Sequence, residues 1–252
     1  MCFLENSQPI VVASHPRSGT HLLIDLLRRQ FSECASWKYP LERNDRLYCN
    51  IDELNGSAKI LTDDIALRIL RRVQCPIIKT HAWAYLDRGF LPDQKDLIQN
   101  EWIEYLKKKG KWVYVYRDPM KVFHSYYHFC IGAQIIDKST PISSFIRQKD
   151  KLGRNRIEQW NDHVSEWSKL QWVMLICFDE IVNQTEILLG QIGSHIGLLP
   201  KFQLPLLPSP FPNLFSSRIS RIFRIRPEST AIINSYKTNR STAFTEGDSE
   251  FI

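Results

Sequence analysis

The amino-acid sequence predicts a single α/β domain, residues 1–252, with a central parallel sheet flanked by helices. Short β-branched runs alternate with amphipathic stretches of about ten to fifteen residues, the pattern of strands and crossover helices. With 43% hydrophobic and 24% charged residues, the composition is that of a globular chain. Polar and charged residues directly follow three of the predicted strands, and this edge is where parallel sheets bind ligands.

The first predicted strand, Ile10 to Ser14, leads into the loop 16–21 (P-R-S-G-T-H) and then into a helix. The helix is indicated by leucines at positions 22, 23, 26 and 27, which share one face. Backbone N–H groups at a helix start, together with Arg17, Ser18 and Thr20, make an anion cradle suited to phosphate. From this loop alone, a plain strand-to-helix turn with a Ser or Thr cap is an equal alternative.

The remaining elements follow in order along the chain. They are a strand over 77–80, a helix over 99–109, a strand over 112–116, a helix from 119, a helix over 156–169, a strand over 172–178 and a helix over 184–195. From Leu199 onward, five prolines followed by basic residues predict an ordered but irregular extension over 199–252, with room for one helix.

Two further strand ends carry candidate functional residues. Lys79 and Thr80 end the middle strand and His81 follows it, and a solvent-facing loop histidine is the alternative explanation for His81. Arg117 ends the next strand, and Ser125 lies nearly two turns into the helix that starts at proline 119. The guanidinium and the hydroxyl can close on one phosphate from two sides, whereas in isolation Arg117 beside Asp118 is more often a salt bridge.

Together the motifs resemble a known family. They are P-R-S-G-T at 16–20, K-T-H at 79–81, R-D-P-x-K-V-x-x-S at 117–125, W-x-x-H-V-x-x-W at 160–167 and C-F-D-E at 177–180. Their order and spacing, from about residue 10 to 198, resemble the soluble, cytosolic-type sulfotransferases that use 3′-phosphoadenosine 5′-phosphosulfate (PAPS). The resemblance implies their P-loop-like sulfotransferase fold.

The resemblance also implies an activity: transfer of a sulfuryl group from PAPS to a hydroxyl or amine of a small-molecule acceptor, with no metal. By resemblance, the 5′-phosphosulfate is bound by Arg17, Ser18, Gly19, Thr20 and His21, and the 3′-phosphate by Arg117 and Ser125. The resemblance places Phe178 near the adenine. It also makes Lys79 the residue that neutralises the transferring group and His81 the general base. The chemistry fits, because an unperturbed imidazole with a pKa of about 6.5 is mostly neutral at pH 7 and accepts a proton. Cationic side chains stabilise the negative charge that develops on the leaving phosphate.

Three departures from the family pattern stand out. Arg17 replaces the usual Lys, and Leu22 stands where cytosolic members often have Trp. The closing R-K-G-x-x-G-x-W segment corresponds to residues 244–251, with Thr245 in place of Arg and Glu250 in place of the second Gly. The basic residues left to replace it are Lys237, Arg240 and the cluster between 218 and 226.

Two other functional classes stay open. A nucleotide-kinase-type phosphotransferase is disfavoured, because the loop lacks the G-K-[ST] of a nucleotide-triphosphate P-loop. A non-catalytic nucleotide or nucleic-acid-binding module is favoured by the net charge of +6 and the altered closing segment, although no nucleic-acid partner is expected.

The composition and sequence patterns also bear on the compartment, metal content and assembly of the protein. Six scattered cysteines without a C-x-x-C pair argue against a disulfide framework and a zinc knuckle. The sequence has neither an apolar run of membrane-spanning length nor a signal-peptide pattern, so we expect a cytoplasmic protein. The dimer motif K-x-x-x-T-V-x-x-x-E is missing, which leaves the oligomeric state open.

Overall fold

The computed structural model describes residues 7–39, 41–54, 61–86, 100–208, 230 and 244–252. Its centre is a five-stranded sheet in the order β2-β3-β1-β4-β5, in which every neighbouring pair is parallel. The strands are β1 (Ile10–Ser14), β2 (Cys49–Asn50), β3 (Ile77–Thr80), β4 (Lys111–Tyr116) and β5 (Val173–Cys177). The predicted α/β class with a central parallel sheet is confirmed.

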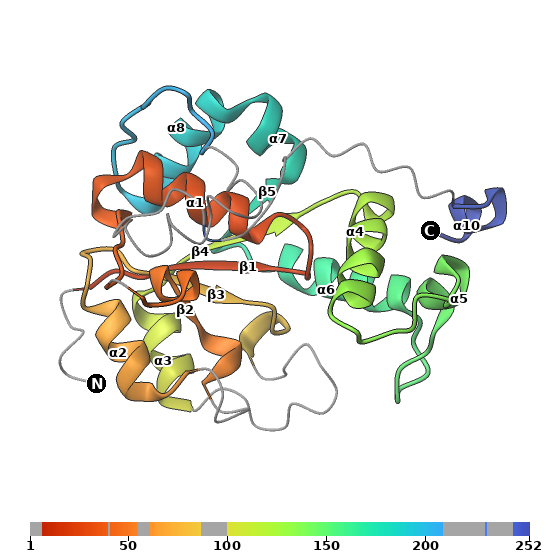
Figure 1. Cartoon of the computed structure of the whole chain (residues 1–252). Helices are drawn as coiled ribbons and strands as arrows, with labels where there is room; N and C mark the ends of the chain where they lie inside the picture. The colour runs from red at the N-terminus through yellow and green to blue at the C-terminus, as the bar shows by residue number, and fades with distance from the viewer. Residues whose placement is uncertain (1–6, 40, 55–60, 87–99, 209–229, 231–243) are drawn as a thin grey trace.

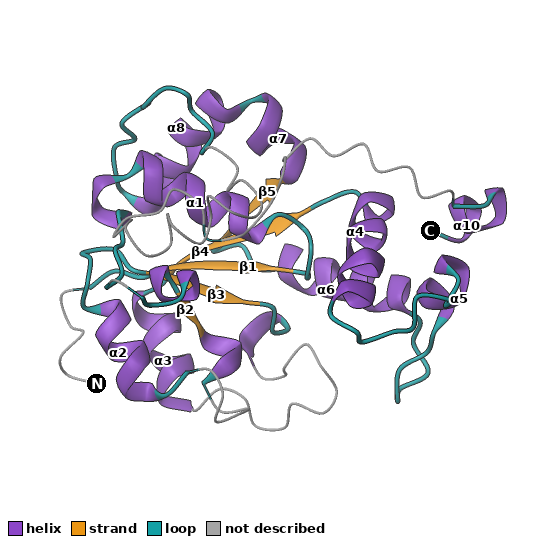
Figure 2. Cartoon of the chain, in the orientation of Figure 1, coloured by secondary structure: helices purple, strands orange, loops and turns teal. Residues whose placement is uncertain are grey.

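The helices surround this sheet (Figure 2). They are α1 (Thr20–Gln30), α2 (Asp63–Leu70), α3 (Asn100–Lys109), α4 (Pro119–Gly132), α5 (Ile142–Arg147), α6 (Arg156–Ser168), α7 (Phe178–Asn183), α8 (Thr185–Ile196) and α10 (Glu246–Phe251). All predicted strands and helices are confirmed to within about two residues, the usual uncertainty of element ends. Strand β2 and helices α2, α5 and α7 are additional.

Two apolar layers cover the two faces of the sheet because side chains alternate along each strand. Val12 and Val113 face a core shared with α1 and α8, whereas Val11 and Tyr114 face a core shared with α2, α3 and α6. Figure 1 shows α1, α7 and α8 on one side of the sheet and α2 and α3 on the other. This double cover explains why the central strands are apolar on both faces.

A third apolar cluster joins α4, α5 and α6, and Phe244 and Ile252 from the end of the chain pack against it. Figure 1 shows α10 beside α5. The side chain of Thr245 caps α10 by accepting the Asp248 N–H at 3.2 Å, and Asp248 is ion-paired with Arg147 of α5. The closing segment is therefore docked on α5. The single-domain boundary 1–252 stays a prediction, since 209–229 and 231–243 lie outside the described residues.

Candidate active site

The loop after β1 is shaped by two residues in the left-handed region. Arg17 has φ 71° and Gly19 has φ 113°. A Cβ on Gly19 would lie 2.3 Å from Cδ2 of Phe178, so the ring of Phe178 occupies the space that any other side chain would need. The adjacent Ser18 hydroxyl is buried and has no hydrogen-bond partner among the residues that the structure describes. The predicted anion cradle therefore contains Gly19, which is packed closely against Phe178, and next to it the Ser18 hydroxyl, an unsatisfied donor.

Arg17 links this loop to α4. Its Nε donates a hydrogen bond of 3.1 Å to Oγ of Ser125, and its guanidinium lies 5.1 Å from the ring centroid of Phe129. The structure thus brings Ser125 to the loop after β1, through Arg17. Within the described residues no hydrogen bond joins Ser125 to Arg117, the pair expected to close on one phosphate.

Arg117 lies over the ring of Phe178, with 4.1 Å from the guanidinium carbon to the ring centroid. Its Nε is buried and finds no hydrogen-bond partner in the described part of the chain. Burial lowers the pKa of Arg117, because desolvation disfavours the charged form. Asp118 does not pair with Arg117 and instead caps α4 by accepting the Lys121 N–H at 2.9 Å.

The acids Asp52 and Glu53 offset the charge of Lys79, but the two arginines of the site differ from this lysine. In the described part of the chain neither Arg17 nor Arg117 forms an ion pair with a carboxylate. Buried polar groups normally have partners, and exceptions need an explanation. Two guanidiniums without carboxylates, together with the unsatisfied Ser18 hydroxyl and Arg117 Nε, fit an anionic ligand such as a phosphate ester.

Phe178 is 7% exposed and packs between Gly19 and Arg117. Its predicted contact with an adenine stays a prediction. The contacts present show an additional role, in which the ring supports the guanidinium of Arg117, since cations favour the negative face of an aromatic ring.

The K-T-H segment ends β3 beside the same loop. Nδ1 of His81 lies 2.7 Å from the carbonyl oxygen of Ser14, the last residue of β1. A carbonyl only accepts, so Nδ1–H is the donor and Nε2 keeps its lone pair. Among the described residues nothing hydrogen-bonds Nε2 of His81. This tautomer presents a base at Nε2.

Electrostatics keep this imidazole neutral. Burial lowers the pKa of His81 well below 6.5, and the positive charge of Lys79 lowers it further. Lys79 is 7% exposed. Burial lowers the pKa of Lys79 as well, while the negative charges of Asp52 and Glu53 oppose that effect.

Thr20 and His21 begin α1. Oγ1 of Thr20 shares a hydrogen bond of 2.6 Å with Oγ of Ser14, so the loop, β1 and His81 form one connected unit. Nδ1 of His21 lies 2.9 Å from Oγ1 of Thr230, and burial lowers the pKa of His21 to about 3. The basic residues considered as replacements for the closing segment, Lys237, Arg240 and the cluster between 218 and 226, lie outside the described residues.

Two residues of the site were not predicted from the sequence. Asp52 accepts hydrogen bonds from Oγ1 of Thr80 at 2.6 Å and from the N–H of His81 at 2.7 Å. Nε2 of His163 donates to the carbonyl oxygens of His81 and Ala82, at 3.1 Å each. Both sides of the His81 peptide backbone are therefore held.

The signals for these two residues were weak. Asp52 follows a strand of only two residues, too short to show an alternating pattern. His163 falls in the W-x-x-H-V-x-x-W motif, but that motif carried no role for the histidine.

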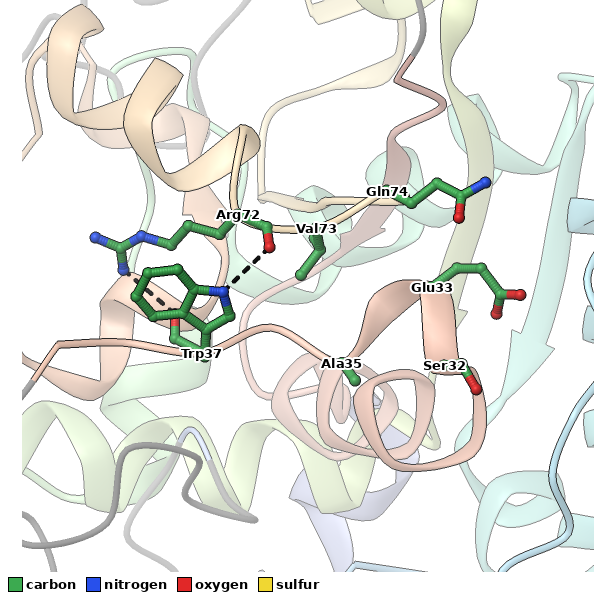
Figure 3. A pocket seen from close by; sticks show the side chains of 7 residues that line it. All are labelled: Ser32, Glu33, Ala35, Trp37, Arg72, Val73 and Gln74. Atoms are coloured by element: carbon green, nitrogen blue, oxygen red, sulfur yellow. Dashed lines mark hydrogen bonds between the residues drawn. The ribbon is translucent and has the colours of Figure 1, made fainter.

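A shallow cavity lies elsewhere, lined by Ser32, Glu33, Ala35, Trp37, Arg72, Val73 and Gln74 (Figure 3). These residues follow α1 or precede β3, so the cavity lies at the amino edge of the sheet. Trp37 and Arg72 hydrogen-bond to each other's backbone carbonyls across it. The predicted residues gather at the opposite, carboxyl edge.

Within the described ranges of the chain, no helix is both long and apolar enough to cross a membrane.

Comparisons with solved structures find similar folds at low identity. Mouse sulfotransferase SULT7A1, complexed with PAP, is 17% identical, with a TM-score of 0.48, over 85% of this chain and 63% of that one. Retinol dehydratase, in a complex with retinol and PAP, is 18% identical, with a TM-score of 0.44, over 77% and 61%. A sulfotransferase from Alicyclobacillus acidocaldarius is 12% identical, with a TM-score of 0.47, over 79% and 86%.

The chain thus spans about three fifths of the length of the first two of these proteins. No curated protein sequence matches it significantly. The family model for the sulfotransferase domain matches residues 7–199, which include β1 to α8 and the three strand ends that form the site. This chain belongs to the sulfotransferase family.

Proposed function

We propose that this chain is an enzyme that transfers a sulfuryl group from PAPS to a hydroxyl or amine of a small-molecule acceptor, with His81 as general base. The observation that carries the proposal is the family match over a glycine cradle with a hydroxyl and two guanidiniums around it, the hydroxyl unsatisfied and the guanidiniums without an ion pair among the described residues. These groups sit beside a neutral histidine with a free Nε2.

The proposed contacts with PAPS, the sulfuryl donor, use the residues of the candidate site. The 5′-phosphosulfate meets Arg17, Ser18, Gly19, Thr20 and His21, the 3′-phosphate meets Arg117 and Ser125, and the adenine lies near Phe178. PAPS supplies the sulfuryl group and leaves as adenosine 3′,5′-bisphosphate. The unsatisfied Ser18 hydroxyl and Arg117 Nε support this assignment, because a phosphate oxygen accepts from both types of donor.

In the proposed mechanism, Nε2 of His81 takes the proton of the acceptor as the acceptor oxygen or nitrogen bonds to sulfur. The bond between sulfur and the 5′-phosphate oxygen breaks in line with this attack. Lys79 and Arg17 stabilise the charge that grows on the departing oxygen, and in a site shielded from water such interactions gain strength. His81 is suited to this role because it is neutral before the reaction.

A second candidate, a non-catalytic nucleotide-binding module, is favoured by one observation. The segment that corresponds to the family's R-K-G-x-x-G carries Asp248, which pairs with Arg147 of α5. A carboxylate at this place offers nothing to a 3′-phosphate. Binding of nucleotide without turnover over a broad acceptor panel would favour the module.

The proposal is tested by replacing His81 with Asn, which keeps a polar side chain but accepts no proton at neutral pH. Product formation, measured as a mass gain of about 80 Da on acceptors with PAPS saturating, should fall by roughly 10² to 10⁴-fold. Thermal stabilisation by adenosine 3′,5′-bisphosphate should persist, since other residues hold the phosphates.

The matched control is His195→Asn on α8, whose Nε2 donates to the Trp112 carbonyl at 2.9 Å, far from the proposed chemistry. It should retain the parent rate. Parent-like turnover in His81→Asn would rule out the general base, and nucleotide stabilisation without turnover in the parent would support the module.

A further inference from the structure

One carboxylate holds two consecutive residues of the K-T-H segment. Asp52 belongs to the 3-10 turn Ile51–Glu53, which directly follows β2, and β2 is the neighbour of β3 in the sheet. Asn50 pairs in register with Lys79. Asp52 therefore sits just beyond the strand pair, where its two oxygens accept from Oγ1 of Thr80 and from the N–H of His81.

The same position makes Asp52 a source of negative charge for Lys79. The titratable groups around Lys79 are Asp52 and Glu53 from the 3-10 turn, His21 from α1 and His81 at the end of its own strand. Only the two acids favour a charged ammonium. Of these, Asp52 raises the pKa of Lys79 more strongly, against the lowering that burial causes.

Asp52 does not contact the imidazole ring of His81. The ring is oriented by the Ser14 carbonyl at Nδ1, and Asp52 bonds only the backbone N–H. A proton relay from His81 to Asp52 is therefore not available. What Asp52 controls is the placement of the backbone that carries both Lys79 and His81.

We propose, on the basis of the function proposed above, that Asp52 is a positioning residue that fixes the Thr80–His81 turn and places a carboxylate charge at the end of the strand pair that holds Asn50 and Lys79 in register. It acts through these residues and touches neither donor nor acceptor. A displacement of about 1 Å at a reacting group can cost about 10²-fold in rate, so the loss of even one of these two carboxylate hydrogen bonds should be measurable.

The test is Asp52→Asn, which keeps the size of the side chain and removes its charge. Product formation at pH 7 should fall by about 10²-fold. The activity should also be lost at a lower pH on the alkaline side, because a Lys79 with a lowered pKa loses its proton earlier. The matched control is Asp162→Asn, an acid with a 52% exposed side chain, which should retain both the rate and the pH profile of the parent.

A purely structural role for Asp52 would lower the rate without moving the alkaline limb, and that result would overturn the charge assignment. A parent-like rate and profile in Asp52→Asn would overturn the proposal as a whole.

A second measurement is independent of turnover. The Lys79 ammonium is titrated by NMR in protein labelled with ¹³C and ¹⁵N lysine, its signal identified by its absence from Lys79→Met. The pKa of Lys79 should be lower in Asp52→Asn than in the parent, and an unchanged pKa would overturn the proposal. If the parent forms no product with any acceptor, the proposed function fails while this titration still decides the role of Asp52.

Should Asp52→Asn fail to fold, the reciprocal titration decides. The positive charge of Lys79 lowers the pKa of Asp52, against the raising effect of burial. Lys79→Met, which keeps the apolar stem, should therefore raise the pKa of Asp52 in protein labelled with ¹³C at aspartate carboxyls. An unchanged Asp52 pKa would overturn the pairing.

Discussion

Replacing Gly19 with Ala should destabilise the fold and damage the nucleotide site together. Gly19 has φ 113°, and a left-handed backbone costs a residue with a Cβ about 1 to 2 kcal/mol. The new Cβ would also lie 2.3 Å from Cδ2 of Phe178, whereas carbon atoms in contact are about 3.5 to 4.0 Å apart. Moving a packed ring by this amount costs about 1 to 3 kcal/mol.

The two costs add to about 2 to 5 kcal/mol. For a chain of this size each kcal/mol lowers the melting temperature by about 2 to 4 °C. Because the ring of Phe178 also supports the guanidinium of Arg117 at 4.1 Å, the variant should lose stabilisation by adenosine 3′,5′-bisphosphate as well. Calorimetry with and without the nucleotide measures both effects.

The control is Gly190→Ala within α8, where a Cβ meets no heavy atom within 4 Å. Alanine in a helix interior is more stable than glycine by about 0.5 to 1 kcal/mol in free energy, so this variant should be slightly more stable than the parent. A Gly19→Ala protein that melts with the parent and binds the nucleotide equally well would refute both the strained loop and its contact with Phe178.

Two further outcomes are expected. Adenosine 3′,5′-bisphosphate at 100 times its dissociation constant should stabilise the parent by about 2.7 kcal/mol. Arg117→Ala should lose more of this stabilisation than the control Arg43→Ala, which replaces an arginine with a 71% exposed side chain. Equal stabilisation of the two variants would contradict the phosphate assignment. Burial raises the pKa of Asp248, but hydrogen bonds from Ser143, Arg147 and Thr245 outweigh it and hold this pKa below its usual range. The docking of 244–252 on α5 is thus fully stabilised above about pH 4 and weakens as pH falls. Amide-exchange protection of this segment should drop at pH 3 and in Asp248→Asn at pH 7, and unchanged protection would contradict the role of Asp248 in docking the segment on α5.

Most of the fold could be predicted because its elements are encoded locally. The β-branched run Ile10–Ser14 and the leucines of α1 have the periods of a buried strand and a one-faced helix. The elements that escaped prediction are short: β2 has two residues, α5 and α7 have six each, and α2 has eight. Such lengths hold too few repeats for a period, and tertiary packing stabilises them instead.

The candidate site, too, could be predicted from the sequence only in part. The sequence by itself determined which strand ends carry chemistry, since the carboxyl ends of parallel strands share one edge and so must bring Ser18, Lys79 and Arg117 near one another. The left-handed backbone that makes Gly19 necessary came from the structure, since only glycine adopts it without a steric cost.

Only the tertiary structure decided which side chains meet. Ser125 pairs with Arg17, which is 108 positions away, and His81 is held by Asp52 and His163, which are 29 and 82 positions away. No local period relates such residues. Their contacts depend on the order β2-β3-β1-β4 in the sheet and on the packing of α4 and α6, and a hydrogen bond needs placement to within a few tenths of an ångström. A linear pattern cannot specify that placement, because the chain between the partners can fold back in many ways until the whole core is packed.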